Sequence, residues 1–260
     1  MEPIASCANV PVGLQLFSIH RACRANDGKD LPALLAQVAE MGYQGVEFAG
    51  FHGWDAADLR RILDDNSLTC CGAHVGMETL LGDELEKSVA THRTLGNRYL
   101  IVPILPSQYR EDLDGWKRAA DALNEIAERL APHDMFTGFH NHPGDFTPID
   151  GQVPMDLMIA RTDPRVIVQV DVGNTLAGGG DPAALIQQLP GRCRTIHLKE
   201  HGGDKNAVLG EGEANWASLL PLAATTGKAE WFIVEHERDP ERALADVEKC
   251  LQNVRAIVGK

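Results

Sequence analysis

Two histidines, His140 and His142, stand one residue apart at the end of the apolar segment FTGFHNH, residues 136–142. The segment has the composition of a buried strand, in which valine or isoleucine would be expected at those two positions. Buried imidazoles need hydrogen-bonding partners or a function. A metal site, a general base and a hydrogen-bonded pair of core histidines would each explain them.

Polar side chains of this kind recur where other short apolar segments end. Residues two apart in a strand point to the same face, so each pair would project together. In folds built on parallel strands, ligands bind where the carboxyl ends of the strands meet. The pairs are His140 with His142, Gln169 with Asp171, His197 with Lys199, and Glu235 with Glu237, while Glu47 and His74 each end an earlier segment.

Four of these residues, His140, Asp171, His197 and Glu235, are candidate metal ligands because they come from consecutive segments about one repeating unit apart. Taken singly, each has an ordinary explanation as a core histidine, a helix-capping aspartate or a rim charge. Together, their burial without a cation or a substrate would be costly. Imidazole combined with carboxylate suits Mn²⁺ or Zn²⁺, which we expect here, with Mg²⁺ or Co²⁺ as alternatives.

Eight strand-like segments alternate with eight helix-like segments, at about 32 residues per unit, which fits a (β/α)₈ barrel. A doubly wound sheet would normally carry a glycine-rich phosphate turn after its first strand, and FSIHRACRAN lacks one. We therefore expect an α/β fold, a single TIM barrel domain over residues 1–260, with Asp114 capping the fourth helix. The expected strands are residues 12–18, 45–48, 69–74, 99–103, 136–142, 166–171, 195–200 and 231–237, and the expected helices lie near 30–41, 55–66, 78–96, 114–133, 153–161, 181–189, 214–226 and 239–257.

The composition argues against several classes of protein. A net charge of −13 opposes nucleic acid as a partner, because binding to the phosphate backbone needs a basic surface. No apolar run is long enough to span a membrane, and the first residues lack the basic and apolar regions of a signal peptide. The six cysteines form no CxxC pair, which favours reduced thiols and a cytoplasmic location.

Six short motifs resemble, in order and spacing, those of the xylose-isomerase-like TIM-barrel superfamily, often labelled sugar phosphate isomerase/epimerase. The resemblance runs from about Val12 to about Val258 and points to the branch that contains HNH, near the inosose dehydratases. Together the motifs are specific for the superfamily but not for a substrate. They are GYQGVE (42–47), HNH (140–142), DVGN (171–174), HLKE (197–200), GEGEANW (210–216) and VEHE (234–237).

The resemblance implies a divalent cation held by a carboxylate on the fifth strand, an aspartate on the sixth, a histidine on the seventh and a glutamate on the eighth. The last three fall on Asp171, His197 and Glu235. The first is replaced, because His140 stands where many epimerases have glutamate. His140 could act as ligand, as base or as both, and Asp145 could instead bend back to complete the site.

These residues suit a metal-dependent isomerase or epimerase that removes a proton next to the carbonyl of a small keto-sugar or polyol through an enediolate. Glu235, His140 or His142 would be the base, and Lys199 would add positive charge beside the oxyanion. Small carbohydrates or inositol-type molecules are the expected substrates. The residues expected to bind them are Glu47, His74, Asn174 and Glu237.

Two segments between strands could complete such a site. The polar segment 200–213 after the seventh strand is a candidate lid. Trp54 is a candidate wall for a sugar ring, and packing of its own loop is the alternative explanation. Barrels of this type often dimerise, so a homo-oligomer remains open.

Three other functions compete with isomerisation. A lyase on the same scaffold would dehydrate a keto-inositol or cleave a 3-keto-glycoside, because an enediolate can also collapse by losing a β-hydroxyl. A hydrolase such as the abasic-site endonucleases of the superfamily needs a DNA-facing basic surface, which the acidic composition opposes. A sugar-binding barrel without catalysis is the third, and the missing carboxylate on the fifth strand leaves it open.

Overall fold

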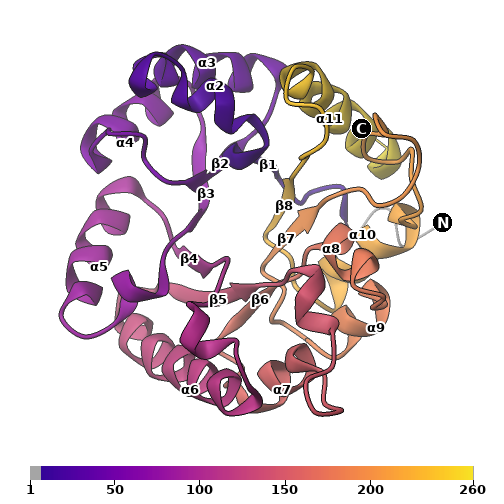
Figure 1. The fold of residues 1–260 in the computed structure, drawn as a ribbon. Coiled ribbons are helices and arrows are strands. Elements are labelled where there is room, and N and C mark those ends of the chain that lie inside the picture. The colour runs from indigo at the N-terminus through magenta and orange to yellow at the C-terminus, as the bar shows by residue number, and fades with distance from the viewer. Residues whose placement is uncertain (1–6, 260) are drawn as a thin grey trace.

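The eight strands expected from the sequence are present and run parallel around a nearly closed barrel, with the helices outside it (Figure 1). The computed structural model describes residues 7–259, and over this range the expected TIM-barrel fold is confirmed. The strands are β1 (Val12–Gln15), β2 (Gly45–Ala49), β3 (Thr69–His74), β4 (Tyr99–Val102), β5 (Phe136–His140), β6 (Ile167–Gln169), β7 (Thr195–Leu198) and β8 (Trp231–Val234).

The barrel closes between its sixth and seventh strands through a short contact. The other neighbours form parallel ladders in the order β6-β5-β4-β3-β2-β1-β8-β7. Between β6 and β7, an isolated parallel bridge joins Asp171 to His197, and the His197 N–H donates to the Val170 carbonyl at 2.9 Å. Two of the candidate metal ligands therefore lie opposite each other at this seam.

The helices largely occupy the expected ranges. Two of them, α2 and α8, fall outside the predicted helix ranges: the first and sixth strands end at Gln15 and Gln169, earlier than expected, and helical turns follow. The α-helices are α2 (His20–Arg24), α3 (Leu31–Met41), α4 (Ala56–Asp65), α5 (Glu84–Leu95), α6 (Leu113–Leu130), α7 (Pro154–Arg161), α8 (Val172–Ala177), α9 (Pro182–Gln187), α10 (Trp216–Thr225) and α11 (Ala243–Val258). The 3₁₀ helices are η1 (Leu16–Ile19), η2 (Ala25–Gly28), η3 (Met77–Leu80), η4 (Ser107–Tyr109), η5 (Ala131–His133) and η6 (Pro143–Phe146).

The start of α6 corrects the expected helix cap. Asp112, in extended conformation, is the N-cap residue, and its carboxylate accepts from the Gly115 N–H at 2.6 Å. Asp114 lies inside the first turn, where its side chain is exposed and pairs with Lys117. The prediction of Asp114 as the cap is therefore wrong by two residues, because only the carboxylate before the first turn can reach the free N–H groups.

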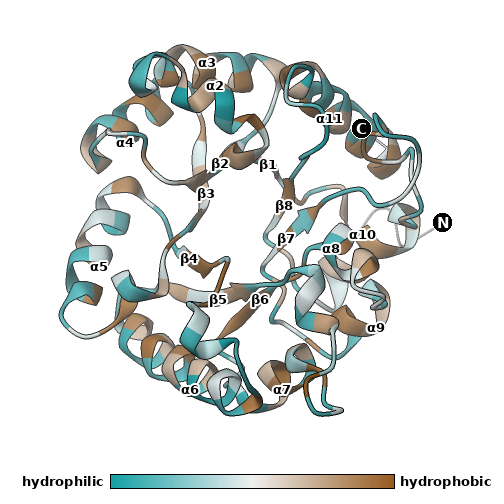
Figure 2. Cartoon of the chain, in the orientation of Figure 1, coloured by the Kyte–Doolittle hydropathy of each residue, from teal (hydrophilic) through white to brown (hydrophobic). Residues whose placement is uncertain are grey.

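Burial of the apolar strand residues holds the barrel together. Figure 2 shows hydrophobic residues along strands such as β4 and β6, and hydrophobic alternating with hydrophilic residues along α6. Leu14, Val46 and Phe232 are among the fully buried strand residues. Among residues 7–259, the helices are all too short or too polar to cross a lipid bilayer.

Candidate active site

The carboxyl ends of β3, β5 and β8 surround a pocket of about 280 Å³. Its lining is partly apolar. Phe17 and Ile104 line the pocket and are 38% and 56% exposed, and Arg24 lines it as well. A polar interior beside exposed apolar groups is a common arrangement for small-molecule sites. The ionisable residues that line the pocket, apart from Arg24, are His74, His140, His142, Glu235 and Glu237.

Four side chains from the ends of β5 to β8 converge at one point: His140, Asp171, His197 and Glu235. One nitrogen or oxygen atom of each lies within 4.8 Å of those of the other three. All four residues are buried, and within residues 7–259 the atoms His140 Nδ1 and Asp171 Oδ2 have no hydrogen-bond partner. Unpaired buried polar atoms are costly, and a cation between them would satisfy both. Two imidazoles with two carboxylates form a donor set that could hold a divalent cation.

Asp171 is positioned by the start of α8 and by Asn141. Its Oδ1 accepts from the Asn174 N–H at 2.6 Å, which caps the helix and leaves Oδ2 to the cluster. The Asn141 amide accepts from the Asp171 N–H at 2.9 Å and donates to Thr175 Oγ1 at 3.1 Å, so it links the end of β5 to α8. Burial raises the pKa of Asp171 to about 7, as expected for a buried carboxyl group without a cation beside it.

His197 lies between two carboxylates. Its Nδ1 contacts Glu235 Oε2, and its Nε2 lies 2.5 Å from Glu47 Oε2. The carboxylate of Glu47 also accepts from Gln15 Nε2 and Gln169 Nε2, both at 2.7 Å. Glu47 is fully buried and committed to these partners. It therefore orients His197 from behind, and we see no free oxygen on it for a substrate.

A local irregularity between β2 and β3 makes room for Glu47. The strand register shifts between Val46 and Glu47, so that Glu47 pairs with Gly72. A Cβ atom on Gly72 would stand 2.4 Å from Glu47 Oε1. Glycine is therefore required beside this buried carboxylate.

Charges around His197 set the protonation of the cluster. Burial alone would lower the pKa of His197, but Glu47 and Glu235 outweigh it and raise the pKa to about 10. Burial would likewise raise the pKa of Glu235, but His197 and Lys199 hold it well below its usual range. Burial, with His197 nearby, lowers the pKa of His140 well below its usual range. His140 is therefore a neutral imidazole at neutral pH, the form that binds metals.

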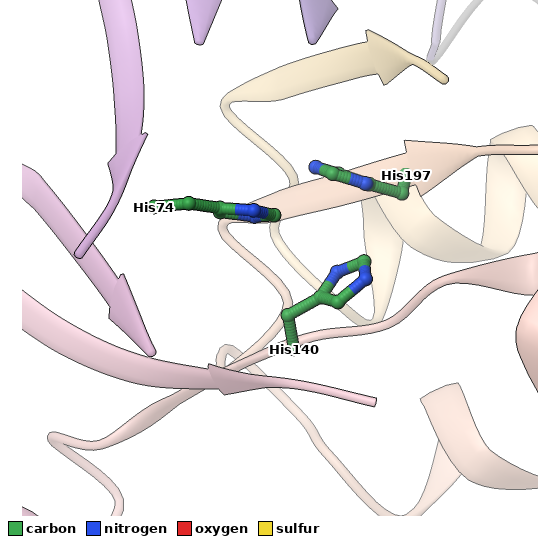
Figure 3. Close-up of side chains that lie close together, drawn as sticks. All are labelled: His74, His140 and His197. Carbon is green, nitrogen blue, oxygen red and sulfur yellow. The ribbon is translucent and has the colours of Figure 1, made fainter. Parts of the chain in front are cut away.

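His74 completes a group of three imidazoles from β3, β5 and β7 (Figure 3). Its ring stacks on His197 with centroids 5.3 Å apart, and the His140 ring lies 5.0 Å away. The amide of Gln169 must turn its NH₂ toward Glu47, so its oxygen faces His74 Nε2 at 2.8 Å. His74 Nε2 therefore carries the proton, and Nδ1 is the nitrogen that can accept a hydrogen bond.

Lys199 lies beside the cluster, between two glutamates that follow β8. It contacts Glu237 directly, and its Nζ lies 3.7 Å from Glu235 Oε1. Burial alone would lower the pKa of Lys199, but Glu235 and Asp171 outweigh it and raise the pKa. Lys199 therefore keeps a positive charge at neutral pH, as a group beside a developing oxyanion would need.

Asp145 does not reach the cluster. Its Oδ2 accepts from the His142 N–H at 2.6 Å, which fixes the backbone at the end of β5. The alternative in which Asp145 bends back to complete the metal site therefore finds no support in the geometry. His142 itself lines the pocket, and burial lowers the pKa of its half-buried ring.

Other residues singled out from the sequence are held by protein groups. The Asn174 side chain donates to the Asn141 carbonyl at 3.0 Å, and Trp54 donates to the Gly28 carbonyl at 2.9 Å while packing against the core. The candidate lid is tied down by Glu200, whose carboxylate accepts from Gly210 N at 2.7 Å and Trp216 Nε1 at 2.8 Å. Asn174, Trp54 and the segment 200–213 do not line the pocket.

Sequence reasoning gave no role in the site to Gln15 and Asn141. Gln15 lies in an apolar stretch, VGLQLFS, where one polar residue gives little signal. Asn141 alternates with the two histidines and therefore points away from the pocket, toward α8. The sign of Asn141 in the sequence is its position between His140 and His142, which puts its side chain on the opposite face of the strand.

Comparisons with known proteins agree with this fold. A family model described as xylose isomerase-like TIM barrel matches residues 35–254. The rhizopine catabolism protein MocC of Rhizobium meliloti is 28% identical, with 83% of this chain and 78% of that protein covered. An inosose dehydratase of Lacticaseibacillus casei is 25% identical, with 78% and 80% covered. The crystal structure of a sugar phosphate isomerase/epimerase from Parabacteroides distasonis aligns with a TM-score of 0.79 at 25% identity, over 94% of this chain and 97% of that one.

Proposed function

Because the chain belongs to the xylose isomerase-like TIM barrel family, we propose that it is a metal-dependent enzyme that removes a proton next to the carbonyl group of a small keto-polyol, of the inosose type. One observation carries the proposal: four buried ligand atoms converge beside a pocket of about 280 Å³, and two of them have no partner in the described part of the chain. A divalent cation bound there would act as a Lewis acid on the substrate oxygens.

The residues around the pocket supply the other parts of such a reaction. Glu235 is ionised because His197 and Lys199 outweigh its burial and lower its pKa, and burial keeps His142 neutral, so both groups are in the proton-accepting form. Lys199 keeps its positive charge near the position where negative charge would develop on oxygen. Arg24 and Ile104, both exposed, also line the pocket.

The placement of the carboxylates favours dehydration over the isomerisation expected first from the sequence. Among the described residues, Glu235 and Glu237 are the carboxylates that line the pocket, and both follow β8. The wall from β3 and β5 offers His74 and His140. Epimerisation exchanges protons on both faces of one carbon and so calls for a base on each wall of the pocket. Among the described residues, the pocket carboxylates lie on one wall, the one that follows β8. In dehydration, one base takes the proton from carbon, the carbon–oxygen bond at the β-position breaks, and an acid returns a proton to the leaving hydroxyl, which departs as water.

The inosose dehydratases among the relatives support the same choice, at identities of 21–25% over about four fifths of each chain. We propose Mn²⁺ or Zn²⁺ as the cation, because both accept imidazole together with carboxylate. The proposed roles are Glu235 or His142 as base, Lys199 as oxyanion partner, and His140, Asp171, His197 and Glu235 as ligands.

The test is to incubate the Mn²⁺-loaded protein with keto-inositols and ketohexoses in D₂O. Dehydration of a keto-inositol would give an enone, detected by its ultraviolet absorbance, together with deuterium in the recovered substrate if proton removal is reversible. Deuterium uptake without the enone would replace the lyase by an isomerase or epimerase. Neither signal with any of these substrates would refute the proposal.

A further inference from the structure

A second cavity adjoins the pocket of the candidate site. It measures about 270 Å³ and shares the wall formed by His74, Val75 and Gly76 with the first. The opposite side of this second cavity belongs to α5, and Gly50 and Phe51 after β2 line its edge. The two cavities are similar in volume, each near the lower limit of about 300 Å³ for ligand pockets, so each suits one small ring.

The second cavity is lined by hydrogen-bonding groups of the kind that bind carbohydrates, together with the ion pair of Lys87 and Glu84. Thr79, Ser88 and Thr91 supply hydroxyl groups, and Phe51 supplies an aromatic surface. Ser88 Oγ donates to the Thr79 carbonyl at 2.7 Å, so its lone pairs can still accept a hydrogen bond. The Thr91 hydroxyl makes no hydrogen bond to any residue in the described range 7–259.

His92 adds a buried donor to this wall. The Asn97 amide is fixed because its oxygen accepts from the Tyr99 N–H at 3.0 Å, so its NH₂ faces His92 Nδ1 at 3.0 Å. His92 Nδ1 is therefore an acceptor, and the proton lies on Nε2. His92 is 3% exposed, and within the described residues its Nε2 has no hydrogen-bond partner. Burial lowers the pKa of His92 to about 4, so the ring stays neutral and offers this one N–H.

We propose that this second cavity is a subsite for a second sugar-like ring, so that the preferred substrate carries such a ring linked to the reacting keto-polyol, as in a glycoside or another two-ring polyol. The His92 Nε2–H, the hydroxyl groups of Ser88 and Thr91 and the face of Phe51 would bind that ring. The reacting ring would lie on the other side of His74, in the pocket beside Glu235. The inference rests on the proposed function, because it takes that pocket as the place of reaction.

The test measures the ratio of two affinities in the Mn²⁺-loaded protein by calorimetric titration. The single-ring ligand is methyl glucoside, and the two-ring ligands are cellobiose, maltose and sucrose, which differ in their linkage. We expect at least one disaccharide to bind wild type about tenfold more tightly than methyl glucoside. Thr91→Trp fills the cavity and should bring that ratio to about one.

Thr94→Trp is the matched control, because Thr94 is exposed one turn further along α5 and does not line the cavity. It should keep the wild-type ratio. Ser88→Phe, from the same wall as Thr91, is the second filling variant and should repeat the loss if Thr91→Trp fails to fold. A ratio of about one in wild type, or a wild-type ratio in both filling variants, overturns the subsite while leaving the proposed function standing. Absence of binding by single-ring and two-ring ligands alike also overturns the subsite, whereas the proposed function is judged separately by the reaction with keto-inositols.

Discussion

Oε2 of Glu47 lies 2.5 Å from Nε2 of His197, although the two residues are 150 positions apart in the chain. When a histidine binds a metal it gives up one proton, and a carboxylate behind the ring holds the other and thereby decides which nitrogen binds the metal. Here Nε2 is the nitrogen that faces Glu47, so Nδ1 is left for the cluster with Glu235 and Asp171. The buried carboxylate at position 47 thus acts on the site through His197.

Glu47→Gln tests this relationship. The NH₂ group of glutamine would meet the donors of His197, Gln15 or Gln169, so we expect metal affinity to fall about 10- to 100-fold. The measurement is a competition titration of the metal against a chromogenic chelator. Glu237→Gln is the control, since Glu237 contacts Lys199 instead of His197. An unchanged affinity in Glu47→Gln would contradict the role assigned to Glu47.

Removal of a carboxylate ligand should remove the metal altogether. We expect wild type to retain a stoichiometric divalent cation after dialysis and Asp171→Ala and Glu235→Ala to lose it, because each variant deletes one of the four converging groups. Elemental analysis by mass spectrometry measures the metal per chain. A metal content equal to that of wild type in both variants would refute the ligand assignment.

Lys199→Met separates catalysis from metal binding. Methionine keeps most of the volume of the side chain and removes its charge, so turnover should fall on the order of 100-fold while the metal stays bound. Initial rates on a keto-inositol and elemental analysis give the two readouts. Lys199→Arg, which keeps the charge, should retain more activity than Lys199→Met. Equal rates in wild type and Lys199→Met would exclude Lys199 from the reaction.

Asp145 should make stability depend on pH near neutrality. Burial raises the pKa of its carboxyl from 3.8 to about 6, so the folded state binds this proton more tightly than the unfolded chain. The resulting stabilisation is complete below about pH 4 and is lost as the pH rises through 6, by roughly 3 kcal/mol in all. Asp145→Asn removes this dependence because asparagine does not titrate. Its side-chain oxygen can still accept from the His142 N–H.

Urea unfolding of wild type and Asp145→Asn at pH 4 and pH 8 measures the effect. Wild type should lose stability from pH 4 to pH 8 and the variant should not. The free energy of unfolding of the variant minus that of wild type should therefore rise by an amount on the order of 2 kcal/mol. Asp156→Asn, at an exposed position of α7, is the control. The same stability difference at both pH values for Asp145→Asn would contradict the buried carboxyl group as the source.

Glu200 should hold the segment after β7 in place. Its carboxylate accepts from four N–H groups, those of His201, Gly210, Ala214 and the Trp216 indole. Glu200→Gln replaces one acceptor by a donor, so backbone amides of residues 201–213 should exchange with deuterium faster, as mass spectrometry can follow. Glu213→Gln, an exposed glutamate of the same segment, should leave exchange unchanged. Fast exchange already in wild type would instead favour the candidate lid.

The histidines of the HNH motif show how far a sequence reaches in this fold. Alternation in a strand places His140 and His142 on one face, and in a parallel barrel every strand ends at the same rim. These two rules also bring Asp171, His197 and Glu235 to that rim, whatever the lengths of the loops. The barrel and the convergence of the four residues could therefore be predicted.

The roles of Glu47 and Asn174 could not be predicted in the same way. Glu47 ends a strand as the others do, yet a shift in register and the missing side chain of Gly72 turn it into the barrel, behind His197. Asn174 follows Asp171 closely, but its side chain bonds to Asn141 across the end of β5. The first outcome depends on an irregularity in strand pairing and the second on how α8 lies against the end of β5, and no periodic pattern records either.

The sequence by itself determined the barrel and the rim where its polar residues gather, because both follow from local periodicity and from the order of the strands. Only the tertiary structure decided which of those residues face a ligand and which support another side chain. That decision depends on packing among strands distant in sequence. Gln15, Gln169 and His197 come from β1, β6 and β7, and they surround Glu47 only after the barrel has closed.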